Sequence, residues 1–161
     1  MGGWKDEFPP LLPAGIHKIS PPKLRELTVA GFPLSQSRGN LWKSFEFILK
    51  VLIDTAIPCD VWVDGSFLTK KMDPGDIDLI VDIPIEFVDT ATPDQLSLIQ
   101  NLSDQLYKKS DKLHSFVMFK APASHVAHAD MMRAHQQWER DFGHAYVSRE
   151  PKGIALVEVS P

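Results

Sequence analysis

Residues 61–66 read Val-Trp-Val-Asp-Gly-Ser and, after nine further residues, residues 76–81 read Asp-Ile-Asp-Leu-Ile-Val. Both stretches are apolar over a length typical of a buried strand, and a glycine ends the first while a carboxylate begins the second. Asp76 and Asp78 lie two residues apart, so on a strand their side chains point to the same face. The pattern predicts two strands, joined by a polar loop, with two carboxylates at one end of a sheet.

These residue types favour a metal and phosphate site. Two neighbouring carboxylates raise each other's pKa unless a cation lies between them. The usual cation for oxygen ligands beside a phosphate is Mg²⁺. Gly65 and Ser66 end a strand, where backbone amides and a hydroxyl can contact phosphate oxygens. We therefore expect Asp76 and Asp78 to hold Mg²⁺ (or Mn²⁺), with a nucleoside triphosphate against Gly65 and Ser66.

The segment from Gly65-Ser66 to Asp76-Ile77-Asp78 resembles the core motif of the nucleotidyltransferase superfamily in its minimal form. The resemblance implies that the Gly-Ser turn binds the triphosphate and that the two acids, completed by a third acid on a later strand, hold the metal. The wider chain is similar to a family of uncharacterised small bacterial proteins of this class. That similarity is carried by residues 12–17, 62–67 and 151–154.

The loop after the Gly-Ser turn departs from the superfamily pattern. A small residue followed by Arg-Gly is common there, whereas this chain has Leu-Thr-Lys-Lys at 68–71, and Gly75 stands where serine often precedes the first acid. Lys70 is our candidate for the cationic contact with phosphate, with Lys71 as its neighbour. A solvated loop lysine is the other interpretation.

The third acid is the more serious departure. Residues 112–117 read Lys-Leu-His-Ser-Phe-Val, so His114 stands where a carboxylate is expected, and imidazole is a poor ligand for Mg²⁺. Asp111, Asp82 and Asp64 are the acids that might replace it. Whether the site is catalytically competent stays open at this point.

The resemblance implies a minimal nucleotidyltransferase that moves a nucleoside monophosphate from ATP or another NTP to a protein or RNA acceptor. Small bacterial members often belong to toxin–antitoxin or antiviral defence systems, which implies a protein partner encoded nearby. The alternative is a catalytically impaired, partner-binding module of the antitoxin type. A third, weaker interpretation is a sensor that binds a nucleotide without turnover.

The remaining chain predicts an α/β fold: one nucleotidyltransferase-like domain over residues 1–161, with a small mixed sheet of three to five strands and helices packed on one face. Residues 1–19 are expected to be an extended arm because prolines recur in them without periodicity. A hairpin is expected over residues 144–161. Helices are predicted over residues 20–31, 35–56, 92–106 and 124–142, and a third strand over 113–119.

Composition excludes several classes. A net charge of −4 argues against a basic nucleic-acid footprint, and the single cysteine, Cys59, excludes an internal disulfide. No apolar run reaches the length of a membrane span and no signal peptide is recognised, so we expect a cytoplasmic protein. Arg38 is expected to be a solvated charge. His125, His128 and His135 are interpreted as a polar helix face rather than a metal site.

Overall fold

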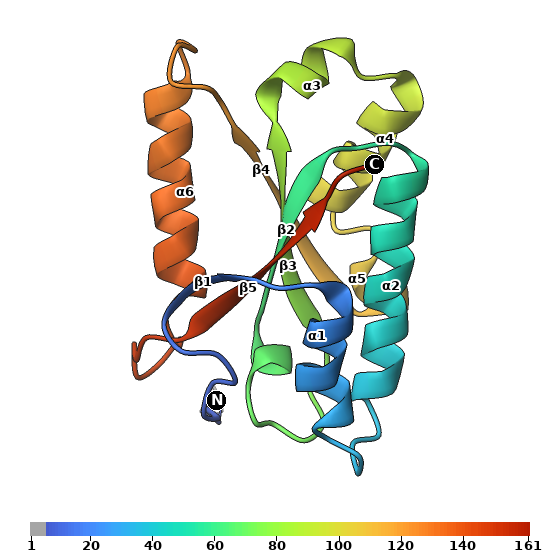
Figure 1. Ribbon diagram of the computed structural model, residues 1–161, viewed down its shortest axis with the longest axis vertical. Coiled ribbons are helices and arrows are strands. Elements are labelled where there is room, and N and C mark those ends of the chain that lie inside the picture. Colours follow the sequence, from blue (N-terminus) through green and yellow to red (C-terminus); the bar gives the residue numbers. More distant parts are fainter. Residues whose placement is uncertain (1–5) are drawn as a thin grey trace.

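Five strands form one mixed sheet in the order β1-β5-β2-β3-β4 in the computed structural model, which describes residues 6–161 (Figure 1). The strands are β1 Gly15–Lys18, β2 Cys59–Asp64, β3 Ile77–Pro84, β4 Leu113–Lys120 and β5 Gly153–Val159. β2 pairs antiparallel with β3 and with β5, whereas β1 runs parallel to β5 and β4 runs parallel to β3. The expected α/β fold with a small mixed sheet is confirmed.

The helices after Ser20 and Thr92 begin where the capping signals predicted, whereas those predicted from residues 35 and 124 begin at Arg38 and His128. Ser20 accepts a hydrogen bond from the amide of Lys23, and Thr92 forms a capping box with Gln95. The helical segments are α1 Pro21–Arg25, the π-helical η1 Glu26–Ala30, α2 Arg38–Asp54, the 3₁₀ turn η2 Ser66–Leu68, α3 Ile85–Thr90, α4 Pro93–Ser103, α5 Lys108–Asp111 and α6 His128–Phe142. The sequence interpretation missed α3 and α5, which are too short to show a hydrophobic period.

The main core lies between one face of the sheet and the helices α1, α2 and α4 (Figure 1). Phe45, Ile48 and Leu52 of α2 are fully buried there against Val61 and Leu79 of the sheet. Burial of each such side chain contributes roughly 2–3 kcal/mol. This packing holds β2 and β3, which carry the Gly-Ser turn and the two acids, on a rigid base.

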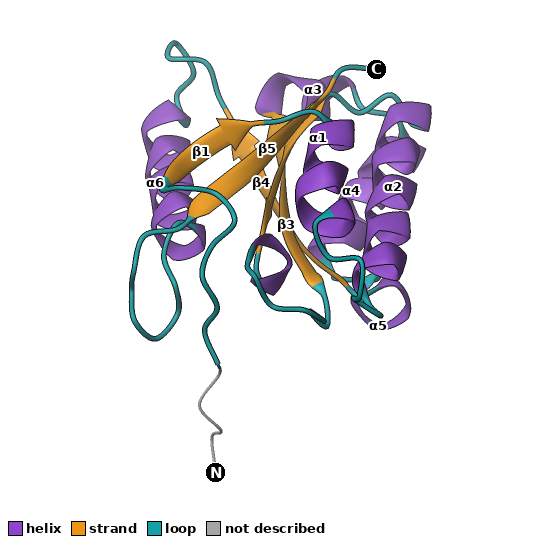
Figure 2. Cartoon of the chain, turned by 60° about the horizontal axis from the view of Figure 1, so that its bottom comes forward, coloured by secondary structure: helices purple, strands orange, loops and turns teal. Residues whose placement is uncertain are grey.

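The opposite face of the sheet is covered in part by α6, so helices lie on both faces rather than one (Figure 2). A second apolar cluster joins them: Trp62, Ile80, Met118, Phe142 and Ile154. The carboxylates of β2 and β3 lie on this face, because alternate residues of a strand point to opposite sides. The sequence did not predict that α6 packs on this face, because Trp138 and Phe142 are the only large aromatic side chains of α6 that contact the sheet.

The two ends of the chain differ from expectation. Residues 6–14 contain no helix and bend at Leu11, Leu12 and Ala14, and residues 15–18 of the predicted arm form β1; residues 1–5 of that arm lie outside the described part. The expected C-terminal hairpin has only its second strand, β5, because residues 146–148 form a turn and the only bridge is His144 with Pro151. β5 pairs with β1 and β2 instead, which satisfies its backbone inside the sheet. Within residues 6–161, no helix combines the length and apolar composition needed to cross a bilayer.

Candidate metal and nucleotide site

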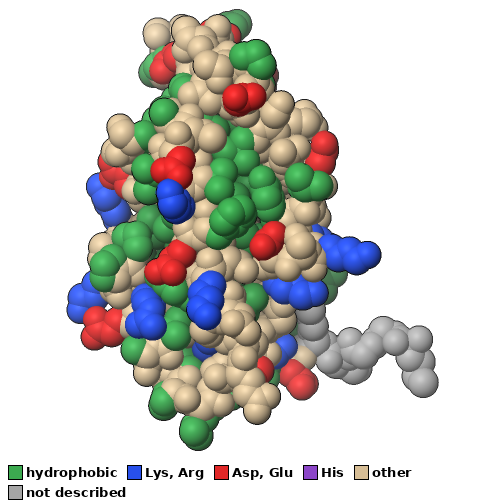
Figure 3. Space-filling view, turned by 90° about the vertical axis from the view of Figure 1, so that its right-hand side faces the viewer, with side chains coloured by type: hydrophobic (Ala, Val, Ile, Leu, Met, Phe, Trp, Pro, Cys, Tyr) green, Lys and Arg blue, Asp and Glu red, His purple; other side chains and the backbone are tan. Residues whose placement is uncertain are grey.

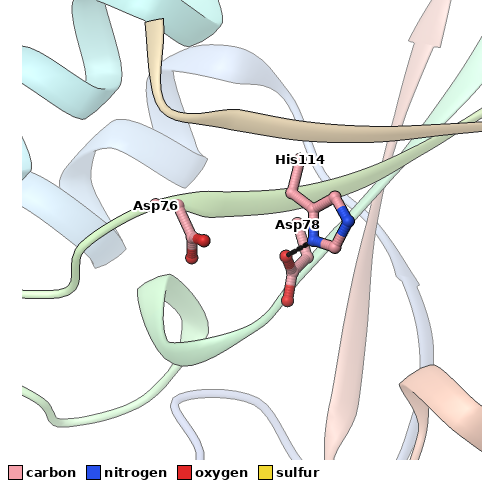
Figure 4. Close-up of side chains that lie close together, drawn as sticks. All are labelled: Asp76, Asp78 and His114. Atoms are coloured by element: carbon pink, nitrogen blue, oxygen red, sulfur yellow. Dashed lines mark hydrogen bonds and ion pairs between the residues drawn. The ribbon is translucent and has the colours of Figure 1, made fainter. Parts of the chain in front are cut away.

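Asp76, Asp78 and His114 meet at one end of the sheet (Figure 4). Asp76 directly precedes β3, and the parallel register of β3 and β4 sets Asp78 beside His114. His114 Nδ1 lies 3.1 Å from Asp78 Oδ1, and one ligand atom from each residue lies within 4.8 Å of the others. In residues 6–161 this is the only group of three such side chains close enough to share a metal ion. The structure therefore brings together the two predicted acids and His114, the residue at the position where a third acid was expected.

The electrostatics of this cluster favour a cation. Burial raises the pKa of Asp78, and the nearby charge of Asp76 raises it further, while His114 acts in the opposite direction. A cation between the two carboxylates would remove their repulsion and compensate the burial of Asp78. Two carboxylates and an imidazole are a donor set that a divalent ion accepts.

Gly65 lies against the same carboxylate. Its φ is +83°, and a Cβ at this position would come within 2.7 Å of Asp78 Oδ2. Only glycine fits, for both reasons. Ser66 then begins η2, and its carbonyl accepts hydrogen bonds from the amide and the hydroxyl of Thr69. The predicted Gly-Ser turn is thus in direct contact with the acid that follows it by thirteen residues.

Asp64 and Lys152 extend the cluster along the sheet. Asp64 is the register partner of Asp78, and its Oδ2 lies 3.1 Å from Lys152 Nζ. Asp64 is only 2% exposed, and its Oδ1 is buried without a hydrogen-bond partner. Burial raises the pKa of Asp64 to about 7, although Lys152 lowers it. The sequence interpretation missed Lys152, whose only signal was its place in a Pro-Lys-Gly turn.

Arg38 is fully buried, so the expectation that it is a solvated charge was wrong. Its guanidinium donates hydrogen bonds to four backbone carbonyls, those of Thr28, Phe67, Thr69 and Lys71. It also stacks over the ring of Phe32, with the guanidinium carbon 3.7 Å from the ring centroid. Burial lowers the pKa of Arg38 to about 10. The side chain therefore fastens the loop after the Gly-Ser turn to α2.

Lys70 lies in that loop with its side chain exposed to solvent. Its backbone amide donates to the carbonyl of Pro9, and the amide of Leu11 donates to the carbonyl of Leu68. The extended arm thus runs alongside the loop. Lys70 stays a candidate for a phosphate contact.

The other acids that might replace the missing carboxylate lie elsewhere. Asp82 is buried and paired with His135 of α6, with Oδ1 and Nε2 3.2 Å apart. Asp111 ends α5 and accepts a hydrogen bond from Ser110. The histidines do not converge, as expected: His128 donates to the carbonyl of Ala121, and His125 accepts from the amide of Ala127. Of the acids considered, only Asp64 is adjacent to Asp78.

These residues fit a divalent cation on two independent observations. Burial and the charge of Asp76 raise the pKa of Asp78, and His114 and Lys152 offset this rise only in part, so the two carboxylates lack full charge compensation. Beside them, a buried oxygen of Asp64 has no partner, which is costly for a polar atom unless a ligand satisfies it.

Comparison with curated proteins and with solved structures finds no match to this chain. A family comparison does find one, and it covers both the cluster and the elements that hold it. Because the match spans residues 5–158, the chain belongs to DUF6932, a family of unknown function.

Proposed function

We propose that this protein is a minimal nucleotidyltransferase that transfers a nucleoside monophosphate from an NTP to a hydroxyl of a protein or RNA acceptor. The observation that carries the proposal is the contact between Gly65 and the Asp78 carboxylate, which unites the Gly-Ser turn and the Asp-x-Asp motif in one site. A hydroxyl of the acceptor would form a bond to the α-phosphorus while the bond to the bridging oxygen breaks. Pyrophosphate and the hydroxyl proton would be released.

Each residue has a distinct role in this proposal. Asp76 and Asp78 would hold Mg²⁺ or Mn²⁺, and the ion when bound supplies charge neutralisation for the triphosphate. Gly65 and Ser66 would contact phosphate oxygens. The candidate cations for a phosphate contact are Lys70, on the loop after the Gly-Ser turn, and Lys152, which is held in place by Asp64. Catalysis would come from positioning and from charge neutralisation rather than from a covalent intermediate.

The test is label transfer. Purified protein is incubated with each of the four α-labelled NTPs and Mg²⁺ or Mn²⁺, alone, with total RNA, and with the protein encoded next to its gene. The proposal expects a labelled acceptor, and loss of the label in Asp76→Asn and in Asp78→Asn. Asp111→Asn is the matched control, because Asp111 lies outside the cluster. Transfer that persists in both site variants, or its absence under every condition, counts against the enzyme.

A second candidate function is a partner-binding module of the antitoxin type. One observation favours it: the face built by α2, α4 and the turn after α4 carries exposed apolar side chains, Phe47, Ile53, Leu96 and Leu106. Figure 3 shows hydrophobic side chains gathered in the middle of that face. Such a surface is typical of protein contacts. Tight binding of the neighbouring gene product that survives Asp76→Asn and Asp78→Asn but is lost in Phe47→Glu, without label transfer, would favour the module.

A further inference from the structure

The side chain of His114 is held in place by its neighbours and does not rotate freely as that of a surface histidine would. Its side chain is 27% exposed, and its Nδ1 is hydrogen-bonded to Asp78 Oδ1 at 3.1 Å. On its other side the ring packs on Phe116, with centroids 4.6 Å apart, and Phe116 packs in turn on Trp138 of α6. These contacts orient the imidazole, with its Nδ1 directed at the Asp78 carboxylate (Figure 4).

The donors around this point are not those of a magnesium site. Mg²⁺ prefers oxygen ligands in near-ideal octahedral geometry, whereas Mn²⁺ and the later divalent metals accept imidazole nitrogen. Here a ring nitrogen lies within 4.8 Å of ligand oxygens from Asp76 and Asp78. On the neighbouring strand, the register partner of Asp78 is Asp64, whose buried Oδ1 has no hydrogen-bond partner while its Oδ2 is paired with Lys152.

We propose that His114 is the third protein ligand of the ion and that this nitrogen ligand makes the site select Mn²⁺ over Mg²⁺. The inference rests on the proposed function in one respect: it assumes that the same ion binds the triphosphate. Binding of the ion itself needs no nucleotide. The competing role for His114 is a hydrogen bond that only orients Asp78. In that role the ring nitrogen never contacts the metal.

The experiment measures the ion on the full, nucleotide-free chain. Mn²⁺ binding is titrated by electron paramagnetic resonance, and pulsed measurements on the bound ion detect coupling to ¹⁴N. We expect nitrogen coupling in the wild type, without any variant being needed. We further expect His114→Gln to lose this coupling and to weaken Mn²⁺ binding by roughly 10- to 100-fold.

Two more variants sharpen the result. His114→Asp should lose the nitrogen coupling and shift the ratio of Mn²⁺ to Mg²⁺ affinity toward Mg²⁺ by about tenfold or more, because an oxygen ligand replaces the nitrogen. His144→Gln is the matched control, since His144 is bound to the carbonyl of Arg140, outside the cluster, and it should keep the coupling and the affinity.

Failure of this inference differs from failure of the proposed function. Bound Mn²⁺ without ¹⁴N coupling, no Mn²⁺ binding at all, or an unchanged Mn²⁺ to Mg²⁺ ratio in His114→Asp would overturn the role of His114. Label transfer with Mg²⁺ that is equal in His114→Gln and in the wild type would overturn it too, while supporting the enzyme. Nitrogen-coupled Mn²⁺ in a protein that transfers no label would support the metal site and count against the transferase.

Discussion

At the scale of single residues, Arg38 lies outside the metal cluster but holds the loop after the Gly-Ser turn in place. It donates hydrogen bonds to four backbone carbonyls, and three of these bonds, to Thr28, Phe67 and Thr69, are buried. Arg38→Met keeps the apolar stem and removes the donors, so several buried acceptors lose their partner. We expect the free energy of unfolding in urea to fall by about 3 kcal/mol or more.

The control for Arg38→Met is Arg25→Met, because Arg25 is exposed on α1. That variant should stay within about 0.5 kcal/mol of the wild type. Equal stability of the two variants would show that the buried guanidinium is not needed to hold the loop.

Asp73 ties the same loop to the beginning of α2. Its Oδ1 accepts hydrogen bonds from the amides of Gln36 and Ser37 and from the hydroxyl of Ser35. These bonds lower the pKa of Asp73, the amide of Gln36 having the largest effect. A lowered folded-state pKa stabilises the fold at pH values above the unfolded pKa, near pH 4, and this stabilisation is lost as the pH falls through the folded value.

Asp73→Asn should therefore be less stable than the wild type at pH 6, and the difference should shrink steadily as the pH falls below about 4. Thermal unfolding of both proteins between pH 6 and pH 3 measures it. Asp89→Asn, which changes an exposed acid on α3, should show no such convergence. A difference between wild type and Asp73→Asn that does not depend on pH would contradict the assignment.

Residue-level outcomes show where sequence reasoning succeeds. Asp76, Asp78 and Gly65 were predicted to form one site because their spacing is local and each residue type is restrictive. The roles of Arg38 and Lys152 were missed, because the partners of Arg38 are backbone carbonyls, which leave no trace in sequence. Lys152 meets Asp64 only through the pairing of β5 with β2.

At the scale of elements, β3 and β4 decide the composition of the metal cluster. Their bounds were predicted to within a residue or two, but not their register, because a parallel pair is joined by a crossover through α3, α4 and α5. The register sets Asp78 beside His114. Of the acids left open as replacements, Asp82 and Asp111 lie outside the cluster of Asp76, Asp78 and His114, because strand register and not sequence distance decides adjacency.

The arm before β1 makes a second element-scale prediction. It runs beside the loop after the Gly-Ser turn, where the amide of Lys70 donates to Pro9 and a bridge joins Pro10 with Thr69. A chain that lacks residues 1–11 should therefore exchange the Lys70 amide with solvent deuterium faster than the full chain. Hydrogen exchange followed by mass spectrometry or NMR measures this.

The internal control for that comparison is the amide of Val63, which lies in β2, the central strand of the sheet, and should exchange equally slowly in both chains. If the Lys70 amide is protected equally with and without the arm, the arm does not order the loop. If Val63 also exchanges faster, the truncation has weakened the whole sheet.

At the scale of the whole molecule, the sheet is covered on both faces, but α6 leaves one end of its own face to the polar cluster. The main core was predictable from the period of α2 and the apolar strands. The second layer was not, because α6 is mostly polar and touches the sheet through few side chains. The cluster lies beside that layer, and Phe116 and Trp138 connect the two.

Because the cluster belongs to the folded sheet and its strands separate on unfolding, an ion bound there must stabilise the whole molecule. At an ion concentration about 100-fold above Kd, the gain is roughly 2.7 kcal/mol, which for a chain of this size raises Tm by about 5–10 °C. Differential scanning calorimetry with Mn²⁺ or Mg²⁺ measures this against chelator. Asp76→Asn and Asp78→Asn should abolish the shift, whereas Asp111→Asn should keep it, because Asp111 ends α5 outside the cluster. An equal shift in all four proteins would place the ion elsewhere, and no shift in the wild type would contradict a metal centre that forms without nucleotide.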